Sequence, residues 1–288
     1  MRQVTVGKMW MLAFLMAGFV AGCGSTQTAT TSAAGNPVAP PLGVTVTFGS
    51  FGGGSGATNQ GINTVINGDL GTTAASTSVT GFHDAGPGCT YTETGSNVGV
   101  VKGKIYTAAP PPTVGCPSEG TATTSATATQ ASVDAIAAWN NLSPASRPSG
   151  TDPGAGQLGS HVLAPGIYKA AGGSFLITGT DLTLDGQGDA NALWVFQAAG
   201  SLTVGDAGAP RSVILVNGAQ AKNVFWYVGS AATINAAGGG TMVGTIIAKS
   251  GVTFSTSGVT AITTLNGRAL ALNASVTMVN TVINVPAQ

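Results

Sequence analysis

Carboxylates and histidines are the side chains of this chain that could support acid–base or metal chemistry, and they are sparse. The ten acidic residues are scattered over 288 residues, and only Asp181, Asp185 and Asp189 cluster, in the segment DLTLDGQGDAN. Such a cluster could bind Ca²⁺, but a tight turn uses the same residue types, and we favour the turn. His83 and His161 have no cysteine or acid at ligand spacing, so we interpret them as ordinary surface or loop residues.

The motifs of the common enzyme classes are also missing from the sequence. The scattered acids do not suggest the paired carboxylates of a glycosidase, and no nucleophile elbow is present. The glycine-rich segments at 52–56 and 238–241 lack the lysine of a phosphate-binding loop and are typical of turns. We therefore expect no enzymatic activity, no cofactor, no bound metal and no small-molecule substrate.

Three cysteines define the remaining covalent chemistry, and two of them, Cys89 and Cys116, lie in the body of the chain. In an exported protein this pair predicts a disulfide. Closing a loop of this length would stabilise the fold by about 3.5 kcal/mol at most. We expect the bond to brace a capping region between the first β segments and a helix. Two unpaired thiols are the alternative, and a zinc site is disfavoured because the spacing is wrong.

The N-terminus has the pattern of an export signal. Arg2 and Lys8 precede an apolar run that is shorter than the roughly 20 residues of a membrane-spanning helix. The run ends in Val-Ala-Gly-Cys at 20–23, which resembles a bacterial lipobox, in which cleavage precedes Cys23 and lipid attaches to it. We expect a signal peptide over 1–23 and a lipid-anchored protein of the outer membrane or cell surface. The alternative is an ordinary signal peptide with an incidental cysteine, and a secreted protein.

Composition narrows the class of protein further. Only 7% of the residues are charged, ten basic residues balance ten acidic ones, and no basic run occurs, which argues against a nucleic-acid partner. Hydrophobic residues make up 43%, enough for a sizeable core, and 44 glycines are present. This combination is typical of many short strands joined by tight turns.

The chain divides into a tether and a folded domain. Residues 24–42 are rich in Ser, Thr, Ala and Pro and predict a flexible tether, followed by one domain over 43–288. Short β segments such as VTVTF, NTVIN and GKIYT occur up to about residue 108. Residues 121–142 contain no Gly or Pro and predict the one substantial helix, which ends before Pro144. Val133, Ile136, Ala137, Trp139 and Asn140 fall at helical spacing on it.

A recurring threonine, held between two apolar residues, is the clearest repeat of the C-terminal part. It occurs at Thr183, Thr203, Thr233, Thr253 and Thr277, and an apolar segment such as ALWVF or NVFWY lies about nine or ten residues before it. Each pair of segments predicts two sides of one coil of a β-solenoid, with the segment at 212–216 on a third side. Because the ALWVF-type segments are apolar on both faces, the helix must cover their outer side.

The threonine strands instead alternate between apolar and small polar residues, so one of their faces is solvent-exposed. This alternation predicts an uncovered face of small hydroxyl and amide side chains: Thr183, Ser201, Thr203, Thr233, Asn235, Thr253, Ser255, Ser275 and Thr277. On neighbouring strands such side chains lie about 4.7–4.9 Å apart and form a flat grid that could hold water in an ordered array. The alternative is that threonine merely suits an exposed strand.

Several longer segments resemble one known family. TVINGDLG (64–71), TGF (80–82), KGKIYTA (102–108), LAPGIYK (163–169), LTLDGQGDANALWVFQ (182–197), NGAQAKNVFWYVGS (217–230) and LNGRALA (265–271) are similar to the microbial ice-binding proteins typed by the domain of unknown function 3494. The resemblance runs from about residue 42 to 286. It implies a mainly β, discontinuous right-handed β-solenoid of triangular cross-section with one long α-helix alongside, and adsorption to ice through a flat solenoid face.

The family has no invariant ice-binding motif, so the threonine assignment depends on this chain's own alternation. The cysteine pair and the lipobox depart from the general family pattern. The first hypothesis is an ice-binding monomer whose partners are ice or ordered water and, through the lipid, a membrane. A surface adhesion or structural module that uses the same scaffold without binding ice is the main alternative, and a carbohydrate-active solenoid is a weaker one.

Overall fold

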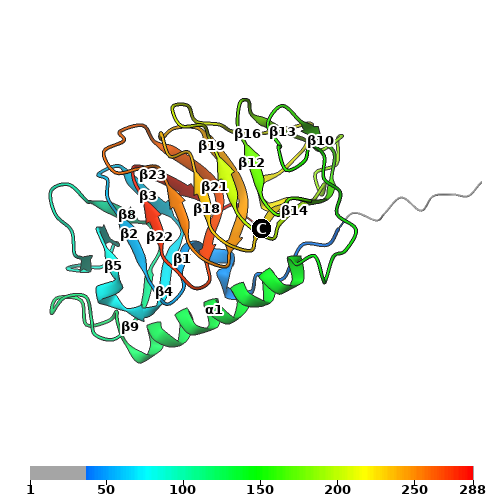
Figure 1. Ribbon diagram of the computed structural model, residues 1–288. Coiled ribbons are helices and arrows are strands. Elements are labelled where there is room, and N and C mark those ends of the chain that lie inside the picture. The colour runs from blue at the N-terminus through cyan, green and yellow to red at the C-terminus, as the bar shows by residue number, and fades with distance from the viewer. Residues whose placement is uncertain (1–36, 288) are drawn as a thin grey trace, which may run out of the picture. The chain divides into compact units, whose positions relative to one another are not determined.

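The computed structural model describes residues 37–287, so the expected signal peptide, Cys23 and most of the expected tether lie outside the described residues. Almost all strand pairs are parallel, and they surround one core on three sides (Figure 1). The described part of the chain contains one α-helix, α1 (Ala122–Leu142), and three short 3₁₀ helices, η1 (Gly43–Thr47), η2 (Ser76–Ser78) and η3 (Ala221–Asn223). None of the described helices is long and apolar enough to cross a membrane.

The first side is a seven-stranded parallel sheet that carries most of the recurring threonines. Its strands, in spatial order, are β12 (Phe175–Ile177), β15 (Leu202–Val204), β18 (Ala232–Ile234), β20 (Val252–Phe254), β22 (Val276–Met278), β2 (Ala57–Asn59) and β5 (Val79–Thr80). The residues on either side of each threonine in β15, β18, β20 and β22 are buried, as the alternation predicts.

The second side faces α1. It contains β11 (Gly166–Lys169), β14 (Trp194–Ala198), β17 (Val224–Val228), β19 (Thr241–Ala248), β21 (Thr263–Ala271), β1 (Phe48–Gly52), β4 (Asp69–Ala75) and β9 (Ile105–Ala108). β14 and β17 are buried at all five positions. The prediction that a helix covers the outer face of these strands is confirmed, because α1 runs along them (Figure 1) and shares a buried cluster with Val195, Phe225 and Ile247.

The third side combines a short sheet with the first halves of β19 and β21. The short sheet is β10 (Val162–Leu163), β13 (Leu182–Asp185) and β16 (Val213–Val216). Beyond β21, this side continues with β23 (Thr281–Asn284), β3 (Thr64–Asn67), β8 (Gly99–Val101) and β6 (Phe82–His83). The last strand, β7 (Thr90–Tyr91), is antiparallel to β6. β19 and β21 each serve two sides. Gly244 adopts φ +100° within β19, and a Cβ on its partner Gly267 would lie 1.8 Å from the Gly244 carbonyl oxygen, so both positions require glycine.

The order of strands in the stack differs from their order in the chain. The C-terminal strands β21, β22 and β23 pair with β1, β2 and β3. The N-terminal segment therefore continues the stack beyond the C-terminal one, which is the discontinuity that the resemblance implied.

Aromatic stacking organises the core. The rings of Phe196 and Trp226, on adjacent strands, are parallel with centroids 4.0 Å apart, and Phe175 meets Phe196 edge to face. Trp226 is 1% exposed and donates its indole N–H to the Val243 carbonyl at 2.8 Å. Side chains thus fill the interior of the solenoid, so a functional site is expected on its outer faces.

The α1 helix begins where predicted, but it buries a different face. Thr121 caps it together with Thr124, and the buried stripe is Ala128, Ala131, Ala135, Ala138 and Leu142. Val133 and Ile136 are 53% and 43% exposed, so the expected apolar face is wrong for them, whereas Trp139 packs on the sheet and stacks on Tyr227. Alanine has the smallest apolar side chain, and a stripe of it lets the helix backbone approach the sheet closely.

Two boundaries near the start of the domain also differ from expectation. The segment VTVTF forms η1 followed by the first residue of β1, although its alternation predicted a strand. Pro40 and Leu42 are buried, Leu42 in the helix-side cluster, so packing begins slightly before the expected end of the tether at residue 42.

Candidate functional site

A row of threonines in register forms the centre of the exposed face of the first sheet, which we call the threonine face. Thr203 pairs with Thr233, Thr233 with Thr253, and Thr253 with Thr277. All four side chains are half-buried and lie between buried apolar neighbours. Because the strands are parallel neighbours, successive hydroxyl and methyl groups repeat at about 4.7–4.9 Å.

The row extends beyond the predicted residues in both directions. Thr277 pairs with Thr58, and Thr58 with Thr80, while Leu176, 40% exposed, lies next to Thr203 at the other end. Sequence reasoning missed these three residues. Ala57-Thr58 and Val79-Thr80 repeat the apolar-threonine pattern, and this signal could have identified the two threonines, but not Leu176.

A second row of small residues runs beside the threonines. It consists of the residues two positions before each row member: Ser174, Ser201, Ala231, Gly251, Ser275 and Gly56. From Ser201 onward, the carbonyl of each accepts from the first N–H of the neighbouring strand, as when Leu202 donates to Ala231. The hydroxyls of Ser174 and Ser201 are 3.1 Å apart and hydrogen-bonded. Ser201 and Ser275 therefore lie on the predicted face, which is flat because its flanking side chains are small.

Thr183 does not belong to this face. It lies on β13 of the third side, where it pairs with Val162 and Ile214. The strand of the same coil that does enter the threonine face is β12, which places Leu176 at the equivalent position. The prediction for Thr183 is wrong because spacing cannot tell a coil from a side. Twenty residues separate Thr183 from Thr203, which lie on different sides, and also Thr233 from Thr253, which lie on successive coils.

Asn235 and Ser255 were predicted to point outward, but they are 1% and 3% exposed. Both follow a threonine by two residues, as outward residues of a strand would. Both, however, adopt left-handed backbone conformations, at φ +47° and +58°, which end the strand and turn the chain toward the third side. The Asn235 side chain then bonds to the backbone of Arg211 and Gly239.

The two rows carry no charged side chain. At the neighbouring corner, Arg211 donates to Asp206 at 2.7 Å, and Asp206 also accepts from the Gly179 N–H. The hydrogen bond from the Gly179 N–H, followed by that from Arg211, holds the pKa of Asp206 below its usual value. The two rows are therefore neutral and can offer hydroxyls and methyls to an uncharged surface.

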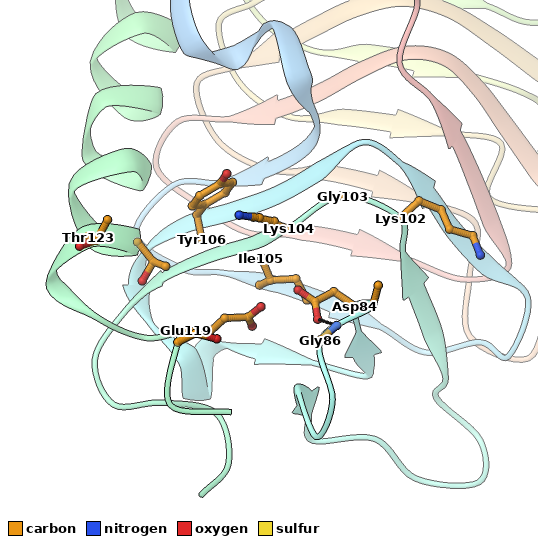
Figure 2. Close-up of a pocket in the computed structure, with 12 residues that line it drawn as sticks. Asp84, Gly86, Lys102, Gly103, Lys104, Ile105, Tyr106, Glu119 and Thr123 are labelled. Atoms are coloured by element: carbon orange, nitrogen blue, oxygen red, sulfur yellow. Dashed lines mark hydrogen bonds between the residues drawn. The ribbon is translucent and has the colours of Figure 1, made fainter. Parts of the chain in front are cut away.

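A second cluster lies in the cap formed by residues 82–120. The side chains of Asp84 and Glu119 approach each other in a pocket of about 590 Å³ that also contains Lys104, Tyr106 and the start of α1 (Figure 2). Burial, followed by a hydrogen bond with Asp84, raises the pKa of Glu119 to about 8. Tyr91 donates its hydroxyl to Glu119, and burial raises the pKa of Tyr91 as well. Glu119 can therefore keep its proton near neutral pH.

The predicted disulfide links the two loops of this cap. Cys89 and Cys116 are bonded, with Cα atoms 5.0 Å apart. The Glu119 carboxylate lies within 4.8 Å of both sulfurs. Because the sulfurs are bonded to each other, they are not thiolate ligands, and the bond fixes the loop that carries Glu119 against the β6–β7 hairpin.

The other candidate residues for metal or acid–base chemistry have structural roles. Asp185 accepts from the Gln187 N–H and the Asn217 amide, Asp189 accepts from the Asn191 N–H, and Asp181 accepts from the Ser212 N–H. These are the bonds of turns and coil contacts, as expected. His83 bonds to Glu93 at 2.6 Å, and His161 is a half-buried residue of the turn before β10.

Known proteins share both sequence and fold with this chain. A family model described as Ice-binding-like matches residues 51–284. The ice-binding protein of Nostoc sp. (strain HG1) is 39% identical over 200 residues, 66% of each chain. Ice-binding protein 1 of Shewanella frigidimarina (strain NCIMB 400) is 40% identical over 124 residues, which cover 42% of this chain and 13% of that protein. The matched segments thus span two thirds of one curated relative and a small part of the other.

A solved structure extends the comparison to the whole described domain. The structure titled Shewanella frigidimarina ice-binding protein_1 DUF3494 Domain aligns with 88% of this chain and 100% of its own, at 27% identity and a TM-score of 0.70. That agreement covers all three sides of the solenoid.

Proposed function

Because the chain belongs to the ice-binding-like family, we propose that it adsorbs to ice through the threonine face. The observation that carries the proposal is the uninterrupted row of six in-register threonines, from Thr203 to Thr80. The relatives named above are called ice-binding proteins, which supports this class of function over catalysis.

The chemistry of the face suits a lattice of water molecules. Threonine is β-branched, so its χ1 angle is restricted, and half-burial between apolar neighbours restricts it further. Ordering these side chains at an ice surface therefore costs little conformational entropy. The hydroxyls can bond water while the methyls exclude it from fixed positions, and each contact is weak. The strength of adsorption then depends on how many threonines lie in the row and on how flat the face is.

We also propose that the mature protein is a monomer anchored through lipid on Cys23 at the outer membrane or cell surface. The support is the sequence Val-Ala-Gly-Cys at 20–23 after an apolar run. An anchor would keep the ice-adsorbing face at the cell. Labelled palmitate should enter the protein, and the mature chain should begin at Cys23. A different mature N-terminus, or no label, would favour secretion.

Ice adsorption is tested by observing single ice crystals in purified protein. We expect crystals to become faceted and a gap to open between the melting and freezing temperatures. Unchanged crystal shape and no freezing gap at high protein concentration would reject the proposal. That result would favour a surface adhesion module built on the same scaffold.

A further inference from the structure

The threonine face is assembled from two segments that are far apart in the chain. They meet at a seam, which we define as the junction of β22 with β2 and of β23 with β3. The same pentapeptide, NTVIN, occupies 63–67 and 280–284, and the two copies pair in register across the seam. The threonine row crosses the seam from Thr277 to Thr58, so two of its six members depend on how the segments align.

One buried amide, that of Asn280, bridges the seam at the corner beside the threonine face. Its Oδ1 accepts from the N–H groups of Ile62 and Asn63 at 3.2 and 3.0 Å, and its Nδ2 donates to the Val259 carbonyl at 2.7 Å. The residue is 6% exposed and adopts φ +46°. A single side chain thus joins three stacked coils, two from the C-terminal segment and one from the N-terminal segment.

The corner that receives this amide has little freedom. A Cβ on Gly61 would lie 2.6 Å from both the backbone nitrogen and Oδ1 of Asn280. From the other side, the Asn59 amide accepts from the Gly61 N–H at 3.0 Å and donates to the Gly61 carbonyl at 2.7 Å. Asn59 directly follows Thr58, so the position of this corner determines where Thr58 lies.

We propose that Asn280 is a positioning residue, which aligns Thr58 and Thr80 with the C-terminal threonines so that all six act as one face. The inference rests on the proposed function for its consequence at ice, but the alignment itself can be measured without ice. Two part-buried hydrogen bonds to backbone donors add to the strand pairing across the seam and fix the alignment at this corner. Removal of the amide takes the partner from both donors and from the Val259 carbonyl, so it should loosen this corner first.

The first test is amide hydrogen exchange in Asn280→Gly, since glycine tolerates the left-handed backbone and removes only the side chain. Asn280→Asp keeps the acceptor for Ile62 and Asn63. The matched control is Asn235→Gly, which removes another buried left-handed corner amide that lies away from the seam. We expect amides of 57–66 to exchange about tenfold faster in Asn280→Gly, much less so in Asn280→Asp, and to be unchanged in Asn235→Gly. Unchanged exchange at 57–66 in Asn280→Gly would overturn the inference, whatever the activity at ice.

The second test measures coupling at the ice surface. Thr58→Tyr and Thr233→Tyr are each made in the wild-type and Asn280→Gly backgrounds, and the freezing gap is measured at fixed concentration. If Asn280 aligns the segments, Thr58→Tyr lowers the gap in the wild type and has little effect in Asn280→Gly, while Thr233→Tyr lowers it in both. An equal effect of Thr58→Tyr in both backgrounds would overturn the positioning role. No effect of Thr233→Tyr in the wild type would instead count against the proposed face, and the exchange result would still decide the inference.

Discussion

Replacing Trp226 by alanine should destabilise the domain without touching the threonine face. The indole is 1% exposed, is stacked on Phe196 at 4.0 Å, and donates to the Val243 carbonyl. Large-to-small changes of this kind cost about 3–5 kcal/mol. We expect the upper part of that range for two reasons. The Val243 carbonyl also loses its hydrogen-bond donor, and the stacking of Trp226 on Phe196 stabilises the core beyond the area that it buries.

For a domain of this size the loss lowers Tm by about 10–20 °C. Differential scanning calorimetry measures the shift, and Val133→Ala is the control, because Val133 is 53% exposed and its truncation should change stability by only about 0.5 kcal/mol or less. Ice activity of Trp226→Ala should follow the folded fraction and be normal near 0 °C if the protein remains folded there. A Tm within about 2 °C of wild type would refute this packing argument, and so would lost activity in fully folded protein.

Three further predictions concern the cap, the helix and the edge of the threonine face. The pKa of Glu119 is raised from 4.5 to about 8 in the folded state. Between these two values the folded state keeps a proton that the unfolded state has lost. The free energy of unfolding should therefore fall as pH rises from about 5 to 8 and level off above pH 8. Glu119→Gln should flatten that slope in denaturant titrations at several pH values, and an unchanged slope would contradict it. Ala135→Leu should overpack the helix–sheet contact and lower the free energy of unfolding by about 1–3 kcal/mol, whereas neutral or increased stability in urea titrations would show that the stripe is loosely packed. Leu176→Thr should lengthen the threonine row by one strand and widen the freezing gap at fixed concentration, and a narrower gap would show that the face already ends at Thr203.

The overall architecture followed from the sequence because its signals are local. Continuous apolar segments predicted strands that are buried on both faces, and alternation around Thr233 and Thr253 predicted strands with one exposed face; both are confirmed. The helix ends were also visible, from Thr121 and the proline at 144.

The errors arose where long-range stacking or backbone handedness decides the outcome. A step of 20 residues separates Thr233 from Thr253, which lie on successive coils, and also Thr183 from Thr203, which lie on different sides. Spacing alone could not distinguish these cases. Asn235 and Ser255 continue the alternation, and only their positive φ angles turn them inward.

The sequence analysis failed to assign Thr58 and Thr80 to the threonine row for another reason. Sequence order places them before every other threonine of the row, whereas the stack places them last. The repeated NTVIN segment was a visible sign that the two ends of the domain meet, but no local pattern says that two identical strands pair with each other.

A matched pair of substitutions tests the central claim most directly. Thr233→Tyr places a bulky ring in the middle of the threonine face, and Thr183→Tyr places the same ring on an equally half-buried strand position of the third side. Both changes are made in fluorescently labelled protein, and binding to the surface of a single ice crystal is measured beside Tm. We predict that Thr233→Tyr abolishes most of the binding with little change in Tm, while Thr183→Tyr binds ice as the wild type does. Full binding by Thr233→Tyr would contradict the assignment, and loss of binding by Thr183→Tyr with an unchanged Tm would place the ice-adsorbing face on the third side.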